Sequence, residues 1–570
     1  MKINGYKINY SEKDLDKKIN AETIAVELIS KSHAGYKSLK DNDKKALEHL
    51  VKASDHINDV SLEQDHHQNL AMKKALEKEA SKSSHAKKSL QLFNFLNGVE
   101  GTNGIDKKPI EIFKGIKGFD GRNFYPTDLS TKEFHKILEK MLKLGKNKEV
   151  KNILSARTMV RRHKDELIAI DYTKYFEKDF SLAAKELEQA SKLVSSKMFK
   201  DYLQKQAKAL LKNDENLDKE ADITWAKMQD TDLEFTLSRE NYDDKMTPTV
   251  FSNKKLSALL EKNKIEATSK DMIGARVGII NKEGTNIILK FKECMKELSI
   301  LMPHSKRYKQ SIGKNDLKQT MVDVDIVSLK GDYAQARGGL TVAQNLPNND
   351  KLSVKSGGGR RNVYHRQIRQ TTDKEKLSKI LNTLVQKPLH KLYNQEADHL
   401  FVIGHENGHS LGPDSSYQNS LGIYKHIVEE LKADVISLAF MPEYVKTKVI
   451  TPTTLKEIYA SVIIGRLFLK AKPQQCLPHR VADLIIFNYL LKDKAICFDK
   501  AKKLDIDFDK IEKSLQNLLS ETIETQLSKS PKTAKTFIDK YSAWSSISNY
   551  IAKTNQKLGI KPYKDIRRHF

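Results

Sequence analysis

The sequence is poor in cysteine and contains no long hydrophobic run. Its three cysteines, Cys294, Cys476 and Cys497, are too widely spaced for a disulfide framework or a cysteine-based zinc finger, so a reducing compartment is expected. The longest apolar run, 458–469, includes Arg466 and is shorter than the roughly 20 residues that cross a membrane. The N-terminal residues lack the apolar stretch of a secretory signal peptide. We therefore expect a cytoplasmic protein without a membrane partner.

The chain also lacks any block of five or six consecutive basic residues, although its net charge is strongly positive. It has 100 Lys and Arg against 74 Asp and Glu, a formal charge of +26. Such an excess favours a nucleic-acid-binding protein, but the basic residues alternate with acidic ones, as in the segment 40–50 (KDNDKKALEHL). We therefore expect no nucleic-acid partner. The charge is interpreted as solvation, or as a mild long-range attraction of acidic peptides.

The rest of the composition is that of a globular protein, with 39% hydrophobic and 31% charged residues. At about 150 residues per domain, the length predicts two to four domains. Apolar residues recur at helical spacing over about 130–225, where Ser130 and Glu133 form a possible capping box. Helical patterns also dominate from about 373 to 530. The pattern predicts a predominantly α-helical α+β protein, with strands bounded by Gly, Asn and Asp at 232–242, 274–281, 322–331 and within 338–350.

The most informative motif is an H-E-x-x-H pattern formed by His405, Glu406 and His409. On a helix, positions i and i+4 share one face, so both imidazoles can bind one metal ion. Glu406 can then act as general base toward a water activated by zinc. Gly408, inside the motif, makes a helix less favourable by about 1 kcal/mol relative to Ala. The interpretation therefore needs a third ligand.

Glu430, on the amphipathic segment 427–440, is the candidate for that ligand. Two His and one Glu leave a fourth tetrahedral position for water, which is typical of catalytic zinc sites. Asp434 lies one helical turn later and can hydrogen-bond the remote nitrogen of a ligand histidine. Taken alone, Glu429 and Glu430 would be a solvated helix face, but their place after H-E-x-x-H favours a metal site. Such a site also accepts other divalent ions.

Five segments in order resemble the dipeptidyl peptidase III family of metallopeptidases, in its bacterial and plant branch. The resemblance covers roughly residues 115–500. In chain order, the segments are ITWAKMQDTDLEFTLS (223–238), RENYDD (239–244), GDYAQARGGLTVAQNLPNND (331–350), EELKAD (429–434) and PHRVADLIIFNYLL (478–491). The first stands before the family's E-x-Y segment, the third leads into its N-(L/I)-P-N turn, the fourth resembles its second zinc motif, and the last begins with a catalytic His.

The resemblance implies a role for each matching residue. His405, His409 and Glu430 would bind one Zn²⁺, Glu406 would be the general base, and Glu429 would support the ligands. Glu240, Asn345 and Asn348 would hold the N-terminal amine and backbone of a short peptide, which the preceding strand would bind as an added β-strand. Tyr242 and His479 would donate hydrogen bonds to the developing oxyanion. The alternatives are a strand aromatic for Tyr242, a helix-start residue for His479, and turn formers for both Asn residues.

The resemblance also implies a monomer with two lobes around a cleft, a helical zinc-binding upper lobe and a lower lobe with a small β-barrel. Its activity would be release of dipeptides from free peptide N-termini. The expected organisation is an N-terminal helical segment of unknown role (1–110), lower-lobe helices and first strands (111–258), part of the upper lobe (259–322), strands returning to the lower lobe (323–371), the helical zinc-binding lobe (372–530) and a C-terminal helical tail (531–570).

Several features depart from the family pattern. Many members have one more residue in the first motif, and Leu431 and Lys432 replace Cys and Arg in the second. The family's C-terminal substrate-binding Arg has no clear match, because Arg567 and Arg568 lie too near the end. The Nudix box of some plant relatives is not found. Two other functions therefore stay open, namely another H-E-x-x-H hydrolase or endopeptidase, and a non-catalytic peptide-binding member.

Overall fold

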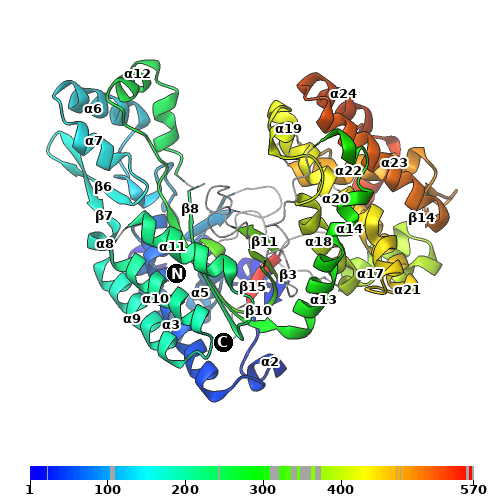
Figure 1. Cartoon of the computed structure of the whole chain (residues 1–570). Coiled ribbons are helices and arrows are strands. Elements are labelled where there is room, and N and C mark those ends of the chain that lie inside the picture. Colours follow the sequence, from blue (N-terminus) through cyan, green and yellow to red (C-terminus); the bar gives the residue numbers. More distant parts are fainter. Residues whose placement is uncertain are drawn as a thin grey trace. The chain divides into compact units, whose positions relative to one another are not determined.

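A computed structural model of the chain shows two compact units (Figure 1). Unit 1 comprises Met1–Ile280, Asp325–Leu340 and Tyr563–Phe570, and unit 2 comprises Asn281–Val324 and Thr341–Pro562. The predicted class, α+β with a predominance of helix and two lobes, is confirmed, whereas the finer division into six ranges stays a prediction. The structure describes residues 1–21, 24–102, 109–212, 214–241, 244–308, 320–334, 343–346, 361–365, 367, 374–469, 471–474, 477–559 and 564–567.

Unit 1 is built mainly from helices, of which α9 packs against both α3 and α10. Its helices are α1 (Glu12–Asp16), α2 (Ala34–Lys37), α3 (Asp41–Asp65), α4 (Asn69–Ala80), α5 (Ser84–Leu96), α6 (Thr131–Lys143), α7 (Asn147–Ile153), α8 (Tyr172–Tyr175), α9 (Glu177–Leu193), α10 (Lys197–Lys212), α11 (Glu215–Lys227) and α12 (Lys254–Lys262). Its strands are β1 (Lys2–Ile3), β2 (Tyr6–Lys7), β3 (Ile24–Glu27), β4 (Glu100–Thr102), β5 (Pro109–Glu111), β6 (Thr158–His163), β7 (Glu166–Asp171), β8 (Leu233–Glu240), β9 (Met272–Asn281) and β15 (Lys564–Arg567). Strands β3 and β15 pair in parallel.

The region 130–225 contains one element that the helical interpretation misses. Strands β6 and β7 form an antiparallel hairpin, with Lys164 at its tip at φ 52°. The start of α6 is as predicted, because the Ser130 hydroxyl accepts a hydrogen bond from the Glu133 N–H at 3.2 Å. The Glu133 carboxylate instead binds Arg162 of β6 at 2.8 Å, so it does not complete the capping box.

Unit 2 is also mainly helical. Its helices are α13 (Lys282–Glu293), α14 (Met295–Leu301), α17 (Lys374–Leu384), α18 (Gln395–His409), α19 (Ser415–Asn419), α20 (Lys425–Lys446), α21 (Pro452–Gly465), α22 (Pro478–Lys492), α23 (Phe508–Leu527), α24 (Pro531–Tyr541) and α25 (Ser546–Lys557). Its strands are β11 (Ala343–Leu346), β12 (Arg361–Tyr364), β13 (Ile496–Phe498) and β14 (Leu504–Ile506), together with the first part of β10 (Thr320–Gly331). No helix in the described ranges is both long enough and apolar enough to cross a membrane.

The largest sheet has five strands in the order β11-β12-β10-β9-β8. Strands β8 and β9 are antiparallel, β10 and β12 are parallel, and β11 is antiparallel to β12. The strands predicted at 232–242, 274–281 and 322–331 are confirmed as β8, β9 and β10. This sheet stands where a small β-barrel was expected, and within the described residues β11 is its terminal strand.

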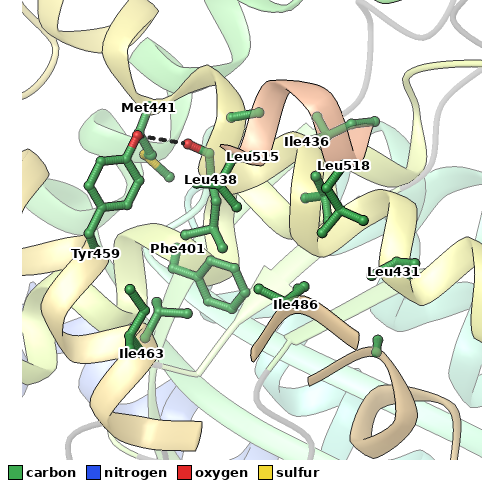
Figure 2. Close-up of a cluster of buried hydrophobic side chains, with 14 of the residues drawn as sticks. Phe401, Leu431, Ile436, Leu438, Met441, Tyr459, Ile463, Ile486, Leu515 and Leu518 are labelled. Carbon is green, nitrogen blue, oxygen red and sulfur yellow. Dashed lines mark hydrogen bonds between the residues drawn. The ribbon is translucent and has the colours of Figure 1, made fainter. Parts of the chain in front are cut away.

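A hydrophobic core joins five helices of unit 2 around α20 (Figure 2). Helix α20 packs against α18, α21, α22 and α23, and the hydroxyl of Tyr459 donates a hydrogen bond to the Leu438 carbonyl at 3.2 Å. Burial of these side chains fixes α20 from several sides, because well-packed interiors leave little free space. The labelled core residues are Phe401, Leu431, Ile436, Leu438, Met441, Tyr459, Ile463, Ile486, Leu515 and Leu518.

Candidate metal centre

Helices α18 and α20 supply the residues of the H-E-x-x-H motif and its expected third ligand. Helix α18 begins after Asn394, whose side-chain oxygen accepts a hydrogen bond from the Glu396 N–H at 2.9 Å. The helix continues through Gly408 to His409, so the glycine does not interrupt it. The two helices pack against each other along this stretch.

Three side chains bring one potential ligand atom each to the same point. Nε2 of His405 lies 3.2 Å from Nε2 of His409. Oε2 of Glu430 lies 3.4 Å from the first of these nitrogens and 3.5 Å from the second. These residues form the group that can hold a metal ion among the described residues. With bonds of 2.0–2.2 Å, the edges of a tetrahedral zinc site are about 3.3–3.5 Å long, so the three separations fit zinc without rearrangement.

Oε2 of Glu430 supports this assignment independently. The atom is buried and accepts no well-formed hydrogen bond from the described residues, although imidazole nitrogens surround it. A buried carboxylate oxygen without a hydrogen bond is costly unless a cation binds it. The residues present therefore fit a divalent metal ion, which His405, His409 and Glu430 could hold.

The remote nitrogen of His405 is held by a buried carboxylate. Its Nδ1–H donates to Oδ1 of Asp434 at 2.7 Å, as expected from the sequence. The other oxygen of Asp434 lies 3.5 Å from Nη2 of Arg466, which in turn lies 3.4 Å from Asp483. Burial lowers the pKa of His405, but Asp434 and Glu430 raise it well above its usual value. This position therefore strongly attracts a cation.

The second histidine has an equivalent support. Nδ1–H of His409 donates to Oε1 of Glu429 at 3.1 Å, and the same oxygen lies 2.9 Å from the buried Nζ of Lys432. Gln526 of α23 donates to Oε2 of Glu429 at 3.2 Å. Burial raises the pKa of Glu429, but Lys432 and His409 outweigh it and lower the pKa to about 2. Each histidine thus has its tautomer fixed by an ionised carboxylate, as is usual in zinc sites.

Two further residues lie near the metal position. His479, at the start of α22, has its Nδ1 3.3 Å from Oε2 of Glu430 and its ring centroid 5.9 Å from that of His405. Its side chain is exposed, so it can also reach a bound molecule. Glu406 is half-buried on α18. Burial and then the charge of Glu406 raise the pKa of Tyr364.

The chain is similar to known proteins in both sequence and structure. No family model matches the chain. Nudix hydrolase 3 of Arabidopsis thaliana is 23% identical over 555 residues, covering 88% of this chain and 68% of that protein. DPP III from Caldithrix abyssi superposes with a TM-score of 0.76 at 24% identity, covering 96% of this chain and 98% of that one. Dipeptidyl-peptidase III from Corallococcus sp. strain EGB gives a TM-score of 0.69 at 19% identity, covering 98% and 97%.

The chain has the fold of dipeptidyl peptidase III. The resemblance predicted from five short segments is therefore confirmed as a resemblance of fold over nearly the whole chain. In this dipeptidyl peptidase III fold, the predicted ligands His405, His409 and Glu430 and the predicted supporting residues Glu429 and Asp434 all meet at one place in unit 2.

The expected substrate-binding residues are placed less completely. Glu240 ends β8 in unit 1, where burial and then the charge of Asp271 raise the pKa of its carboxyl. Asn345 lies on β11 opposite Asn362 of β12, and its side chain is outside the described set. Tyr242 and Asn348 lie outside the described residues.

Sequence reasoning missed several residues around the candidate metal position. Arg466 and Gln526 are far from the motifs along the chain, and Lys432 was noted only as a departure from the family pattern. The sequence does indicate that Arg466 is unusual, because it is the charged residue inside the apolar run 458–469. A buried position for such a residue requires a partner, and here the partners are Asp434 and Asp483.

Proposed function

We propose that the protein is a zinc-dependent dipeptidyl peptidase that releases dipeptides from the free N-termini of short peptides. The observation that carries the proposal is the meeting of His405, His409 and Glu430, with both histidines backed by carboxylates, within a dipeptidyl peptidase III fold. The similarity to Nudix hydrolase 3 does not argue for Nudix chemistry in this chain, because function depends on the residues of the site and not on overall sequence similarity.

His405, His409 and Glu430 would hold one zinc ion and leave a position open for water or substrate. When bound, zinc supplies Lewis-acid chemistry that lowers the pKa of water and polarises a carbonyl group. Asp434 and Glu429 keep both imidazoles in the tautomer that presents Nε2. These contacts orient the ligands before any metal binds, which reduces the cost of assembling the site.

Glu406 follows the first ligand on α18 and is half-buried. It would take a proton from the attacking water and deliver it to the leaving amine. His479, next to Glu430 and exposed, would donate a hydrogen bond to the developing oxyanion. Tyr242 is proposed as a second donor because of its place in the E-x-Y segment.

The peptide would bind along the edge of β11. This strand is terminal in the sheet as far as it is described, and it contacts α18, the helix that carries Glu406. An edge strand offers unpaired main-chain groups, so it can add a peptide with little regard to side chains. Asn345, Asn348 and Glu240 would hold the amine end of the peptide. We further propose that the enzyme acts as a cytoplasmic monomer.

Mass spectrometry of the products tests this proposal. Purified protein is incubated with a short unblocked peptide and with its N-acetylated form, and the bound metal is measured in parallel. We expect about one zinc per chain, release of N-terminal dipeptides from the free peptide, and no cleavage of the acetylated peptide because amine capture requires a free amine. Cleavage of both peptides at internal bonds would instead identify an endopeptidase.

The variant Glu406→Gln separates metal binding from catalysis. It keeps the size of the side chain and removes the base, so zinc content should stay at the parent level while hydrolysis is almost lost. Full activity in E406Q would contradict the mechanism. Zinc binding without cleavage by the parent protein would indicate a non-catalytic peptide-binding function.

A further inference from the structure

We propose that Gly408 and Gly404 are positioning residues of the metal site, because they set the distance between α18 and α20. The inference rests on the proposed metal site and deepens it. Neither glycine can act as a ligand, and neither has a positive φ. Their importance therefore lies in the side chain that is absent.

Gly408 lies directly against the backbone of α20. A Cβ built on Gly408 would stand 2.8 Å from the carbonyl oxygen and 2.9 Å from the Cα of Ala433. Both distances are shorter than real Cβ contacts, and both neighbours are backbone atoms that cannot rotate away. Ala433 lies between the ligand Glu430 and the supporting residue Asp434. The two helices thus approach each other closely in the same turns that carry the residues of the metal site.

Gly404 makes the same kind of approach one helical turn earlier, but toward side chains. A Cβ there would overlap the hydroxyl of Ser437 and would lie 3.0 Å from Cε of Met441. The Ser437 hydroxyl donates to the Phe401 carbonyl at 2.8 Å, so this contact also ties α20 to α18. Because the obstructing atoms belong to side chains, substitution of Ser437 can relieve them.

An added methyl group at Gly408 must separate the two helices. Helix α20 cannot retreat easily, because α21, α22 and α23 pack against it. Separation would lengthen the distances of 3.4 and 3.5 Å that join Glu430 to the two imidazoles. Zinc tolerates deviations of only about 0.2 Å in its bonds. Affinity for zinc should fall, even though Ala favours an isolated helix over Gly.

The test measures zinc affinity by competition with a chelating dye, for the full chain and three variants. Gly408→Ala should bind zinc at least tenfold more weakly than the parent, and Gly404→Ala should be weakened less. Gly465→Ala is the matched control, since Gly465 is also helical and a Cβ there meets no atom within 4 Å. The control should bind zinc like the parent.

Rescue variants distinguish positioning from general damage. Ser437→Gly removes the obstructing hydroxyl, so G404A/S437G should bind zinc as tightly as S437G alone, whereas Ala433→Gly added to G408A leaves the obstructing backbone and should not restore affinity. Parent-like zinc affinity in G408A would overturn the inference, as would an unrescued loss in G404A/S437G. If G408A does not fold, the comparison of G404A with G404A/S437G is sufficient to test the inference. A parent protein that binds no zinc would overturn the proposed function itself.

Discussion

Removal of the buried charge of Lys432 should destabilise unit 2 strongly. Nζ of Lys432 lies 2.9 Å from Oε1 of Glu429, and the lysine side chain is 1% exposed. In Lys432→Met, the apolar part of the side chain is retained, so little packing is lost. Glu429 then keeps its hydrogen bonds from His409 and Gln526 but loses the lysine cation beside it.

The size of the effect follows from the burial of the pair. Removing one partner of a buried ion pair costs about 3–5 kcal/mol, because a buried charge is left uncompensated. Since two donors to Glu429 remain, the lower end, about 3 kcal/mol, is expected. Lys446→Met is the matched control, because Lys446 pairs with Glu443 at 2.7 Å on the same helix with the same spacing, but its side chain is 67% exposed. That variant should lose less than about 1 kcal/mol.

Urea denaturation of the metal-free protein measures both variants. Tryptophan fluorescence, to which Trp544 at the core of unit 2 and the buried Trp225 of unit 1 both contribute, is followed together with circular dichroism of the helices. An equal and small loss in K432M and K446M would refute the argument, because burial would then make no difference to the pair. Lys432→Arg should lose less stability than K432M, since it keeps the positive charge.

Three further predictions concern catalysis, pH and metal. His479→Ala should lower kcat about 10²–10³-fold with unchanged zinc content, and loss of zinc from this variant would show that His479 is a ligand instead. Burial and then the charge of Asp218 raise the pKa of Asp222 to about 7. The stability from this group is therefore present at low pH and lost as pH rises through 7. The Asp222→Asn variant lacks this carboxyl, so its unfolding free energy relative to the parent should be ~2 kcal/mol higher at pH 8 than at pH 5. The control Asp230→Asn, at an exposed position, should show no such change. Zinc at 1,000 times its Kd should raise the unfolding free energy of the metal-free protein by about 4 kcal/mol, and the gain should disappear in His409→Ala.

Local sequence patterns predicted much of this structure because the responsible interactions are local. The i, i+4 spacing of His405 and His409 depends only on helix geometry, and the Ser130 cap depends on residues three apart. Strands β8, β9 and β10 followed from β-rich runs with turn residues at their ends. The hairpin β6–β7 was missed because its strands are short and charged, and no Asn-Gly or Gly-containing turn marks its tip.

The parts of the site that were not predicted depend on contacts between distant segments. Arg466 and Gln526 reach the carboxylates only because α21 and α23 pack on α20. Helix propensity alone predicts that Gly408 destabilises α18, whereas its packing against Ala433 requires a residue without a side chain. Such contacts are invisible to helix propensity, which tertiary packing commonly overrides.

A zinc-dependent peptidase with Glu406 as its general base should keep its metal but lose its activity when that carboxylate is removed. Parent protein and E406Q are assayed side by side for bound zinc and for products from a short peptide with a free N-terminus. We expect about one zinc per chain in both proteins, and N-terminal dipeptides from the parent alone. Equal hydrolysis by both proteins, or a parent that binds no zinc at His405, His409 and Glu430, would contradict it.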